Sequence, residues 1–215
     1  MAAIFNKQFD IKLRLGIAGF LAVAGGIAGV ALYALHPNNI DTGYTPIQPV
    51  SYSHKLHAGN LGMDCTYCHY TVDKSSFAAV PATETCMNCH HQVKPKSPKL
   101  QLVRESYASG EPVPWVKVHR LPDYVYFNHQ AHVTSGVSCV SCHGRVDQMV
   151  EVRQVSPLSM AWCLDCHRNP APNVRPPEFV TKLDWQPEGD PAVLGAQLIK
   201  AKGINPPVNC SGCHR

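Results

Sequence analysis

Beyond residue 35 the sequence lacks any long segment in which apolar residues recur with a helical or an alternating period. It also lacks a solitary cysteine, because all 10 fall into close pairs. Proline and glycine are frequent, with 18 and 15 residues, and they break regular structure into short pieces. Long helices or a sheet therefore do not organise this region. We expect one domain of mostly irregular chain with short helices, arranged around something other than secondary structure.

The ten cysteines form five Cys-x-x-Cys pairs, and histidine follows each pair directly. Two thiols three positions apart can reach the two vinyl groups on one edge of a porphyrin, and the next residue can turn its imidazole onto the iron. The sequence therefore predicts five haem c groups in a multihaem cytochrome c fold. The predicted attachment cysteines are Cys65, Cys68, Cys86, Cys89, Cys139, Cys142, Cys163, Cys166, Cys210 and Cys213, and the predicted proximal ligands are His69, His90, His143, His167 and His214.

Zinc ribbons, redox dithiols and disulfide frameworks also use paired cysteines. None of them requires a histidine after every pair, so five such repeats exclude these alternatives. The formal charge of +4 does not indicate a nucleic-acid partner, because the two propionates of each haem outweigh the single net charge of a ferric centre.

Leu15–Leu35 is an uncharged run of 21 residues, and at about 1.5 Å per residue a helix of this length crosses a bilayer. A cleaved signal peptide is the alternative, but the small residues that resemble its cleavage site, at 22–24, lie inside the apolar run. Lys7, Lys12 and Arg14 precede the run, so the positive-inside rule predicts residues 1–14 in the cytoplasm. We expect a single-pass protein of the inner (cytoplasmic) membrane whose haem domain is periplasmic.

Gly25 and Gly29 stand in G-x-x-x-G spacing within this run, which favours close packing against partner helices. Small residues are also simply common in membrane helices, and that reading stays open. Residues 36–51 are polar, contain proline and show no period, which predicts an extended tether. The pentahaem domain is predicted at 52–215.

An internal repeat divides this domain. The pattern aromatic-x-His-x-x-His begins at Tyr52 and again at Phe127, and two attachment motifs follow each time. We expect dihaem units at 52–90 and 127–167, with the fifth haem at 210–214. Near the C-terminus, Asp190, Pro191 and Gly203 are typical of the N-cap, first position and end of a helix over 192–202.

Low-spin haem iron needs a second axial ligand, and imidazole is the commonest donor. The repeated pairs supply His54, His57, His129 and His132 as predicted distal ligands, because residues three apart on a helical turn share a face. The pairs resemble those of multihaem cytochromes of the c3 and c7 type, which implies that the first histidine serves the haem just downstream and the second serves another. His119 is the first candidate for the fifth distal ligand, and Met149, Met160 and His91 are weaker ones.

Segments outside the motifs resemble the pentahaem subunit of alternative complex III. They are Ser53–Gly59, Thr83–His90, Gly110–Val133 and Met160–Pro170. The resemblance covers nearly the whole chain and implies a respiratory or photosynthetic membrane complex that oxidises a quinol such as menaquinol. An iron–sulfur subunit would pass electrons to this chain, beside integral membrane subunits and membrane lipid, and a cytochrome c, a small copper protein or an oxidase would accept them. Quinol is oxidised at another subunit in that family, so no catalytic site is expected here.

Two other functions stay open. A NapC/NrfH-like quinol dehydrogenase is also an anchored multihaem cytochrome, but about thirty residues separate Leu35 from Cys65 here, so no haem has to lie at the membrane face. An oxyanion-reducing enzyme needs one iron with an open position. Seven histidines outside the motifs make an open position unnecessary.

Overall fold

The computed structural model describes residues 6–214, which fall into two compact units, Met1–Asp41 and Thr42–Arg215. Residues 1–5 of the predicted cytoplasmic segment lie outside the described part. Residues 6–214 form one long helix near the N-terminus, short helical segments after it and no strand, and the isolated bridges Val125–His214 and Val137–Val174 are the β-type pairs of this range. The expectation of short helices without a sheet is confirmed.

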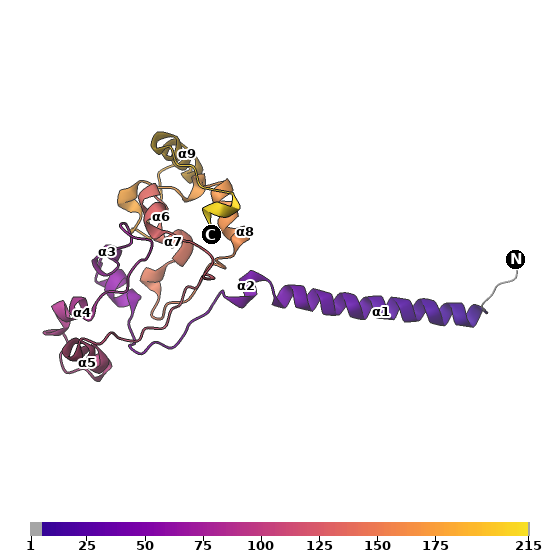
Figure 1. Cartoon of the computed structure of the whole chain (residues 1–215), viewed down its shortest axis with the longest axis horizontal. Helices are drawn as coiled ribbons and strands as arrows, with labels where there is room; N and C mark the ends of the chain where they lie inside the picture. The colour runs from indigo at the N-terminus through magenta and orange to yellow at the C-terminus, as the bar shows by residue number, and fades with distance from the viewer. Residues whose placement is uncertain (1–5, 215) are drawn as a thin grey trace. The chain divides into compact units, whose positions relative to one another are not determined.

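The first unit consists of the long helix α1, Lys7–Ala34, and the single turn α2, Pro37–Ile40 (Figure 1). The Asn6 side chain caps α1 by accepting from the Phe9 N–H at 2.8 Å. An 18-residue window of α1 has a mean hydropathy of 2.1, and this is the one helix within residues 6–214 that is long and apolar enough to cross a membrane. Helix α1 also continues through the charged residues before 15, where Asp10 pairs with Arg14 at 2.9 Å.

The predicted tether at 36–51 differs from what the structure shows. Its first part forms α2, and its second part belongs to the second unit. The Gly43 N–H donates to the Gln154 carbonyl at 2.7 Å, and Val50 is only 6% exposed. The Gln154 N–H donates in return to the Tyr44 carbonyl at 3.0 Å, and so short a pairing leaves no hydrophobic period in the sequence.

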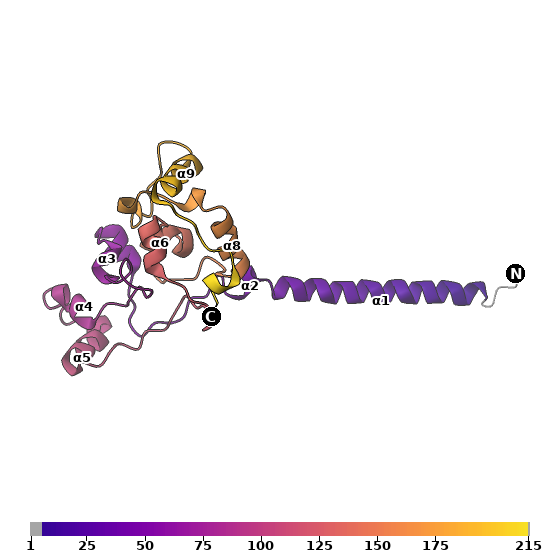
Figure 2. The ribbon, with the colours of Figure 1, turned by 45° about the horizontal axis from the view of Figure 1, so that its top comes forward.

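The second unit is built from thirteen short helical segments. They are η1 (Lys55–Asn60), α3 (Cys65–Cys68), α4 (Thr83–His90), η2 (Pro98–Leu100), α5 (Gln101–Ser109), α6 (His129–Ser135), α7 (Cys139–His143), η3 (Val146–Gln148), α8 (Met160–Arg168), η4 (Ala171–Asn173), η5 (Pro177–Phe179), α9 (Pro191–Lys202) and η6 (Cys210–Gly212). Helices α4 and α5 lie side by side in both ribbon views (Figures 1 and 2).

Helix α9 confirms the sequence prediction for 192–202. The Asp190 carboxylate accepts from the Ala192 N–H at 2.8 Å, and Gly203 ends the helix at a φ of 64°. Gly195 faces Ala171 so closely that a Cβ there would overlap the Ala171 carbonyl. This contact fixes α9 against η4.

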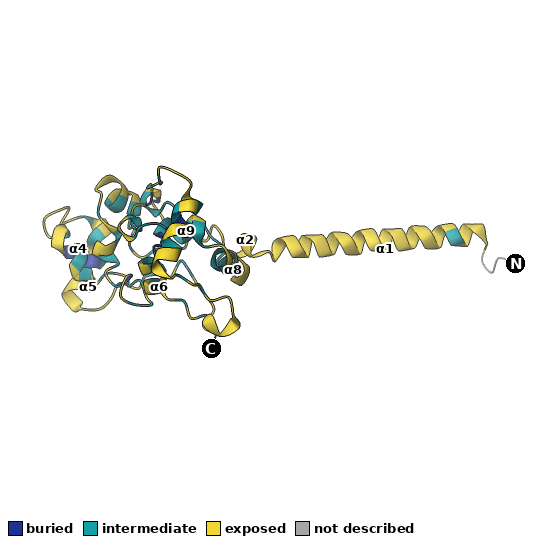
Figure 3. Ribbon diagram, turned by 90° about the horizontal axis from the view of Figure 1, so that it is seen from above, coloured by how far each residue is buried: buried dark blue, intermediate teal, exposed yellow. Residues whose placement is uncertain are grey.

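The protein interior is small. The buried apolar side chains are mostly valines, and a cluster of Val50, Met87, Val103 and Val113 forms the core beside α4. Val180 and Ser138 are the largest side chains that are fully buried among the described residues. Figure 3 shows the resulting predominance of half-buried and exposed surface in this unit. An interior of this size does not organise a domain of this length without further apolar material.

Candidate haem sites and their histidines

Each Cys-x-x-Cys-His motif lies on a short helical segment, and we number these sites 1 to 5 in chain order. Site 1 has Cys65, Cys68 and His69 on and just after α3, and site 2 has Cys86, Cys89 and His90 in α4. Site 3 has Cys139, Cys142 and His143 in α7, site 4 has Cys163, Cys166 and His167 in α8, and site 5 has Cys210, Cys213 and His214 at η6. Helical spacing puts both thiols of a motif on one face, as a bivalent attachment requires.

Backbone carbonyls orient most of the attached histidines. Nδ1 lies 2.9 Å from the Ala79 carbonyl in His69 and 2.9 Å from the Val93 carbonyl in His90. In sites 4 and 5 the partners are the carbonyls of Pro207, at 2.7 Å, and Tyr124, at 3.2 Å. A carbonyl only accepts, so Nδ1 carries the proton and Nε2 keeps a free lone pair. This is the tautomer that binds iron through Nε2.

The two aromatic-x-His-x-x-His segments adopt the same side-chain arrangement. Tyr52 meets His54 edge-on, with centroids 4.8 Å apart, and stacks on His57 at 4.5 Å. Phe127 meets His129 edge-on at 4.7 Å and stacks on His132 at 4.6 Å. The aromatic ring therefore separates the two imidazoles of each pair and turns them in different directions.

The backbone completes this arrangement. His57 Nδ1 lies 2.9 Å from the Ser53 carbonyl, and His132 Nδ1 lies 2.8 Å from the Asn128 carbonyl, four residues earlier in both cases. His129 Nδ1 lies 2.9 Å from the Ser76 carbonyl. In the first pair, His54 is the N-cap of the π-helical turn η1 and His57 lies within that turn. Both histidines of the second pair lie in the α-helix α6.

Each paired histidine faces one attached histidine. The ring centroids are 6.5 Å apart for His54 and His69, 6.3 Å for His57 and His90, 6.4 Å for His129 and His143, and 6.0 Å for His132 and His167. Two imidazoles that bind one metal ion from opposite sides, each at a metal–nitrogen distance of about 2 Å, hold their centroids roughly 6 Å apart. The residues of sites 1 to 4 therefore fit a haem iron between paired imidazoles.

The electrostatics of these histidines favour neutral rings. Burial, followed by nearby imidazoles, lowers the pKa of His54 to about 4 and that of His143 to about 3. Burial also lowers the pKa of His132. His54 Nδ1 is buried without a hydrogen-bond partner. A neutral imidazole is the form that ligates a metal.

Site 1 lies between sites 2 and 3. Burial first, and then the Cys86 thiol of site 2, raises the pKa of Cys68. The neighbouring Cys139 thiol lowers the pKa of Cys65, and the Cys65 thiol, followed by burial, raises the pKa of Cys139. The attachment cysteines of sites 1 and 3 are thus close to each other, although the two motifs are far apart in sequence.

Site 4 similarly lies between sites 3 and 5. Burial, followed by the thiols of site 4, raises the pKa of Cys142 to about 11. Burial and then the Cys213 thiol raise the pKa of Cys163. His167 also contacts Pro207, shortly before the motif of site 5. The neighbouring thiols of sites 2 and 1, 1 and 3, 3 and 4, and 4 and 5 order the sites as 2, 1, 3, 4 and 5, which differs from their order in the chain.

Residues 125–215, which hold sites 3 to 5, match the family model described as cytochrome c7 and related cytochrome c. This part of the chain is thus similar to cytochrome c7 and related cytochromes c. The fold class is that of multihaem cytochromes c, and haem c is the cofactor that this family implies. The chain is also 39% identical, over 97 residues, to the multihaem cytochrome c subunit of a menaquinone reductase from Nitratidesulfovibrio vulgaris (strain Hildenborough). The match covers 45% of each chain, so this chain spans about half of that relative.

The four candidates for the fifth distal ligand lie in different surroundings. His119 Nε2 lies 3.2 Å from His143 Nδ1, beside an attached histidine and not opposite one. His91 Nδ1 lies 2.7 Å from the Met87 carbonyl, and its ring packs edge-on against Tyr107. Met149 is 6% exposed, whereas Met160 is 65% exposed at the start of α8.

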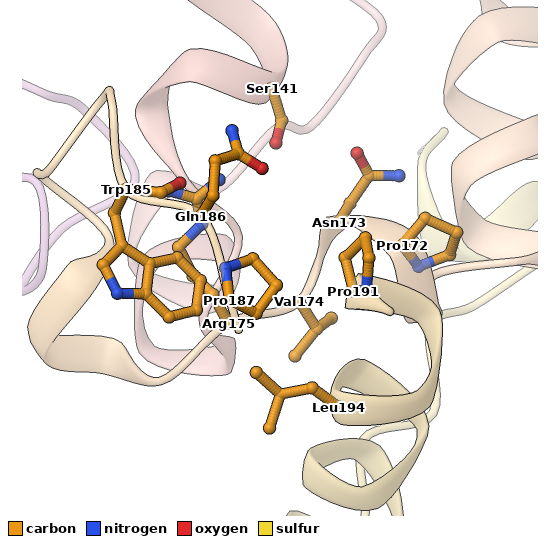
Figure 4. A pocket seen from close by; sticks show the side chains of 10 residues that line it. All are labelled: Ser141, Pro172, Asn173, Val174, Arg175, Trp185, Gln186, Pro187, Pro191 and Leu194. Atoms are coloured by element: carbon orange, nitrogen blue, oxygen red, sulfur yellow. The ribbon is translucent and has the colours of Figure 1, made fainter. Parts of the chain in front are cut away.

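The sequence did not single out a cavity of about 220 Å³ beside site 3. Ser141 of α7, Trp185 and Arg175 are among its lining residues (Figure 4). The Arg175 guanidinium lies 5.2 Å from the centre of the Trp185 ring, which stacks on Phe179. Arginine pairs well with carboxylates, so Arg175 is a candidate partner for a haem propionate.

Proposed function

We propose that the chain binds five haem c groups, one at each site, and relays electrons between partner proteins. Four irons would be held by paired imidazoles: His69 with His54, His90 with His57, His143 with His129, and His167 with His132. The ring spacings of 6.0 to 6.5 Å in all four pairs carry this proposal. Bound haem would supply one-electron exchange at each site.

For site 5 we propose Met160 as the distal ligand of the iron bound to His214. Met160 lies one turn before Cys163 in α8, and the Cys163 thiol is close to Cys213 of site 5. Its exposed thioether is free to reach a group placed there. Methionine in place of histidine raises the reduction potential, so site 5 would be the most oxidising end of the relay.

The spatial order of the sites supports a relay with two ends. Neighbouring thiols link site 2 to site 1, site 1 to site 3, site 3 to site 4 and site 4 to site 5, so sites 2 and 5 would be the two ends. Electrons would enter from an iron–sulfur partner subunit at one end and leave at the other to a periplasmic cytochrome c, copper protein or oxidase. In this role the chain needs no substrate site of its own.

The apolar helix α1 supports a place in the inner membrane. The haem domain would lie outside it, and the partner complex would be similar to alternative complex III, as the sequence resemblance implies. The related menaquinone reductase subunit favours a second candidate function, in which a similar relay delivers electrons to a quinone-reducing partner. Assays of the intact complex in both directions, with menaquinol or a reduced cytochrome as donor, distinguish the two. A NapC/NrfH-like protein would instead oxidise menaquinol as a purified single subunit.

Mass spectrometry of the purified chain tests the cofactor content. We expect the mass to exceed that of the polypeptide by five haems, because every one of the 10 cysteines belongs to a site. No thiol should react with an alkylating reagent in the denatured protein. A smaller haem number, or any labelled thiol, would contradict five covalent sites.

Replacing Gly25 and Gly29 with leucine tests whether α1 packs against partner helices. Apart from the chain neighbours and the helix's own backbone, no described atom lies within 4 Å of a Cβ at either position, so the larger side chains fit within the chain itself. Membrane insertion and haem content should persist, because the segment stays apolar. Loss of close packing should cost about 1–2 kcal/mol of association, so co-purification with the complex should fall roughly 5- to 30-fold.

The matched control replaces Ala24 and Ala31, which lie on another face of the same helix, with leucine. If both double variants co-purify equally with the complex, α1 is only a tether. Reduction by dithionite should be normal in either variant.

A further inference from the structure

Site 3 differs from the other sites in what holds its attached histidine. His143 Nδ1 lies 3.2 Å from His119 Nε2, and the two rings meet edge-on with centroids 4.3 Å apart. The corresponding nitrogens of His69, His90, His167 and His214 all face backbone carbonyls. An imidazole thus takes the place of a peptide oxygen at one of five equivalent positions.

The direction of this hydrogen bond follows from the proposed ligation. His143 must leave Nε2 free for iron, so its proton is on Nδ1 and that N–H donates. His119 Nε2 is therefore the acceptor, and the proton of neutral His119 is on Nδ1. Neither nitrogen of His119 then has a free lone pair, which removes it from the candidates for a distal ligand.

We propose that His119 is a positioning residue for site 3, which accepts the His143 N–H and thereby lowers the reduction potential of the haem attached there. This inference rests on the proposed haem content. An imidazole nitrogen is a stronger base than a peptide carbonyl, so it draws the proton of His143 further and makes that ring a stronger donor to iron. A stronger donor stabilises the ferric state.

The location gives the effect a role in the relay. Site 3 is the middle of the proposed order 2, 1, 3, 4, 5, so electrons that cross the chain in this order would pass it. The ring of His129, opposite His143, makes an interplanar angle of only 8° with it. His119 fixes the rotation of His143 and so maintains this parallel arrangement.

The test compares redox titrations of His119→Phe and His119→Gln holoprotein with the unchanged protein. Phenylalanine keeps an aromatic ring but removes the acceptor, so one of five components should shift upward. At a fixed ambient potential, the ferric-to-ferrous ratio of that component should fall about tenfold, which corresponds to about 59 mV for one electron. Glutamine offers a carbonyl oxygen like the other sites, so we expect a shift of about threefold in the same direction.

His36→Phe is the matched control, since it makes the same change at a histidine of the first unit. It should leave all five components in place. The low-spin electron paramagnetic resonance signal of one haem should also change in His119→Phe alone, because the His143 ring loses its orienting bond.

Each outcome decides the question. Five unshifted components in a variant with full haem content would refute the role of His119, and so would an equal shift of all five. Should His119→Phe fail to incorporate haem, because it leaves a buried N–H unpaired, the glutamine variant alone decides. A mass that shows fewer than five haems in the unchanged protein would instead contradict the proposed function.

Discussion

Alanine in place of His54, His57, His129 or His132 is expected to convert one low-spin haem in five to high spin. Each of these side chains faces one attached histidine at 6.0 to 6.5 Å between ring centroids. Without it the iron keeps one protein ligand and an open position. The porphyrin should stay attached, because both thioether bonds and the proximal histidine are unchanged. Optical and electron paramagnetic resonance spectra, together with binding of carbon monoxide, measure the change.

The four variants should differ in which site each of them affects. His54→Ala and His129→Ala should affect sites 1 and 3, whereas His57→Ala and His132→Ala should affect sites 2 and 4. Met160→Ala should open site 5 and remove the component of highest potential. His36→Ala serves as the control and should keep every haem low-spin. If two of the four histidine variants left the spectrum unchanged, the assignment from the repeated pairs would be wrong.

Removal of site 3 is expected to divide the relay. In the double variant Cys139→Ala, Cys142→Ala, four haems should remain by mass. Sites 2 and 1 are neighbours on one side of the missing haem, and sites 4 and 5 are neighbours on the other side. In the intact complex the physiological donor should therefore reduce only the two haems on its own side, and electron delivery to the acceptor should fall to background. Dithionite should still reduce all four.

Removal of site 5 by Cys210→Ala, Cys213→Ala provides the comparison. This change deletes an end of the order, so the remaining four haems stay connected. If the donor enters at site 2, all four should be reduced rapidly while exchange with the acceptor is lost. Rapid reduction of all four haems in the site 3 variant would show that electrons bypass site 3, and the linear order would be rejected.

The sequence predicted the chemistry of the sites better than their arrangement. Adjacent residues determine a Cys-x-x-Cys-His motif, and the short spacing of His54 and His57 is equally local. The proximity of Cys65 to Cys139 depends instead on packing between distant segments, which no local pattern encodes. The pairing of Gly43, within the predicted tether, with Gln154 is another contact between distant segments.

Single histidines were the least predictable. His119 has the residue type of a ligand, but its role depends on which atom of His143 it meets. Similarly, Tyr124 orients His214 through a backbone carbonyl, and a carbonyl leaves no mark in the amino-acid sequence. Histidines that recur in a repeat can therefore be recognised as candidate ligands from the sequence, whereas the contacts of histidines that occur once require the structure.

The small protein interior has a consequence for how the cytochrome is made. Val180 and Ser138 are the largest fully buried side chains among residues 6–214, so the polypeptide by itself has little apolar surface to offset its loss of conformational entropy. Folding then has to follow haem attachment and cannot precede it, much as a metal ion nucleates a zinc finger. Chains that wait for haem remain open to proteases. Cellular haem supply, more than synthesis of the chain, would set how much of this protein accumulates.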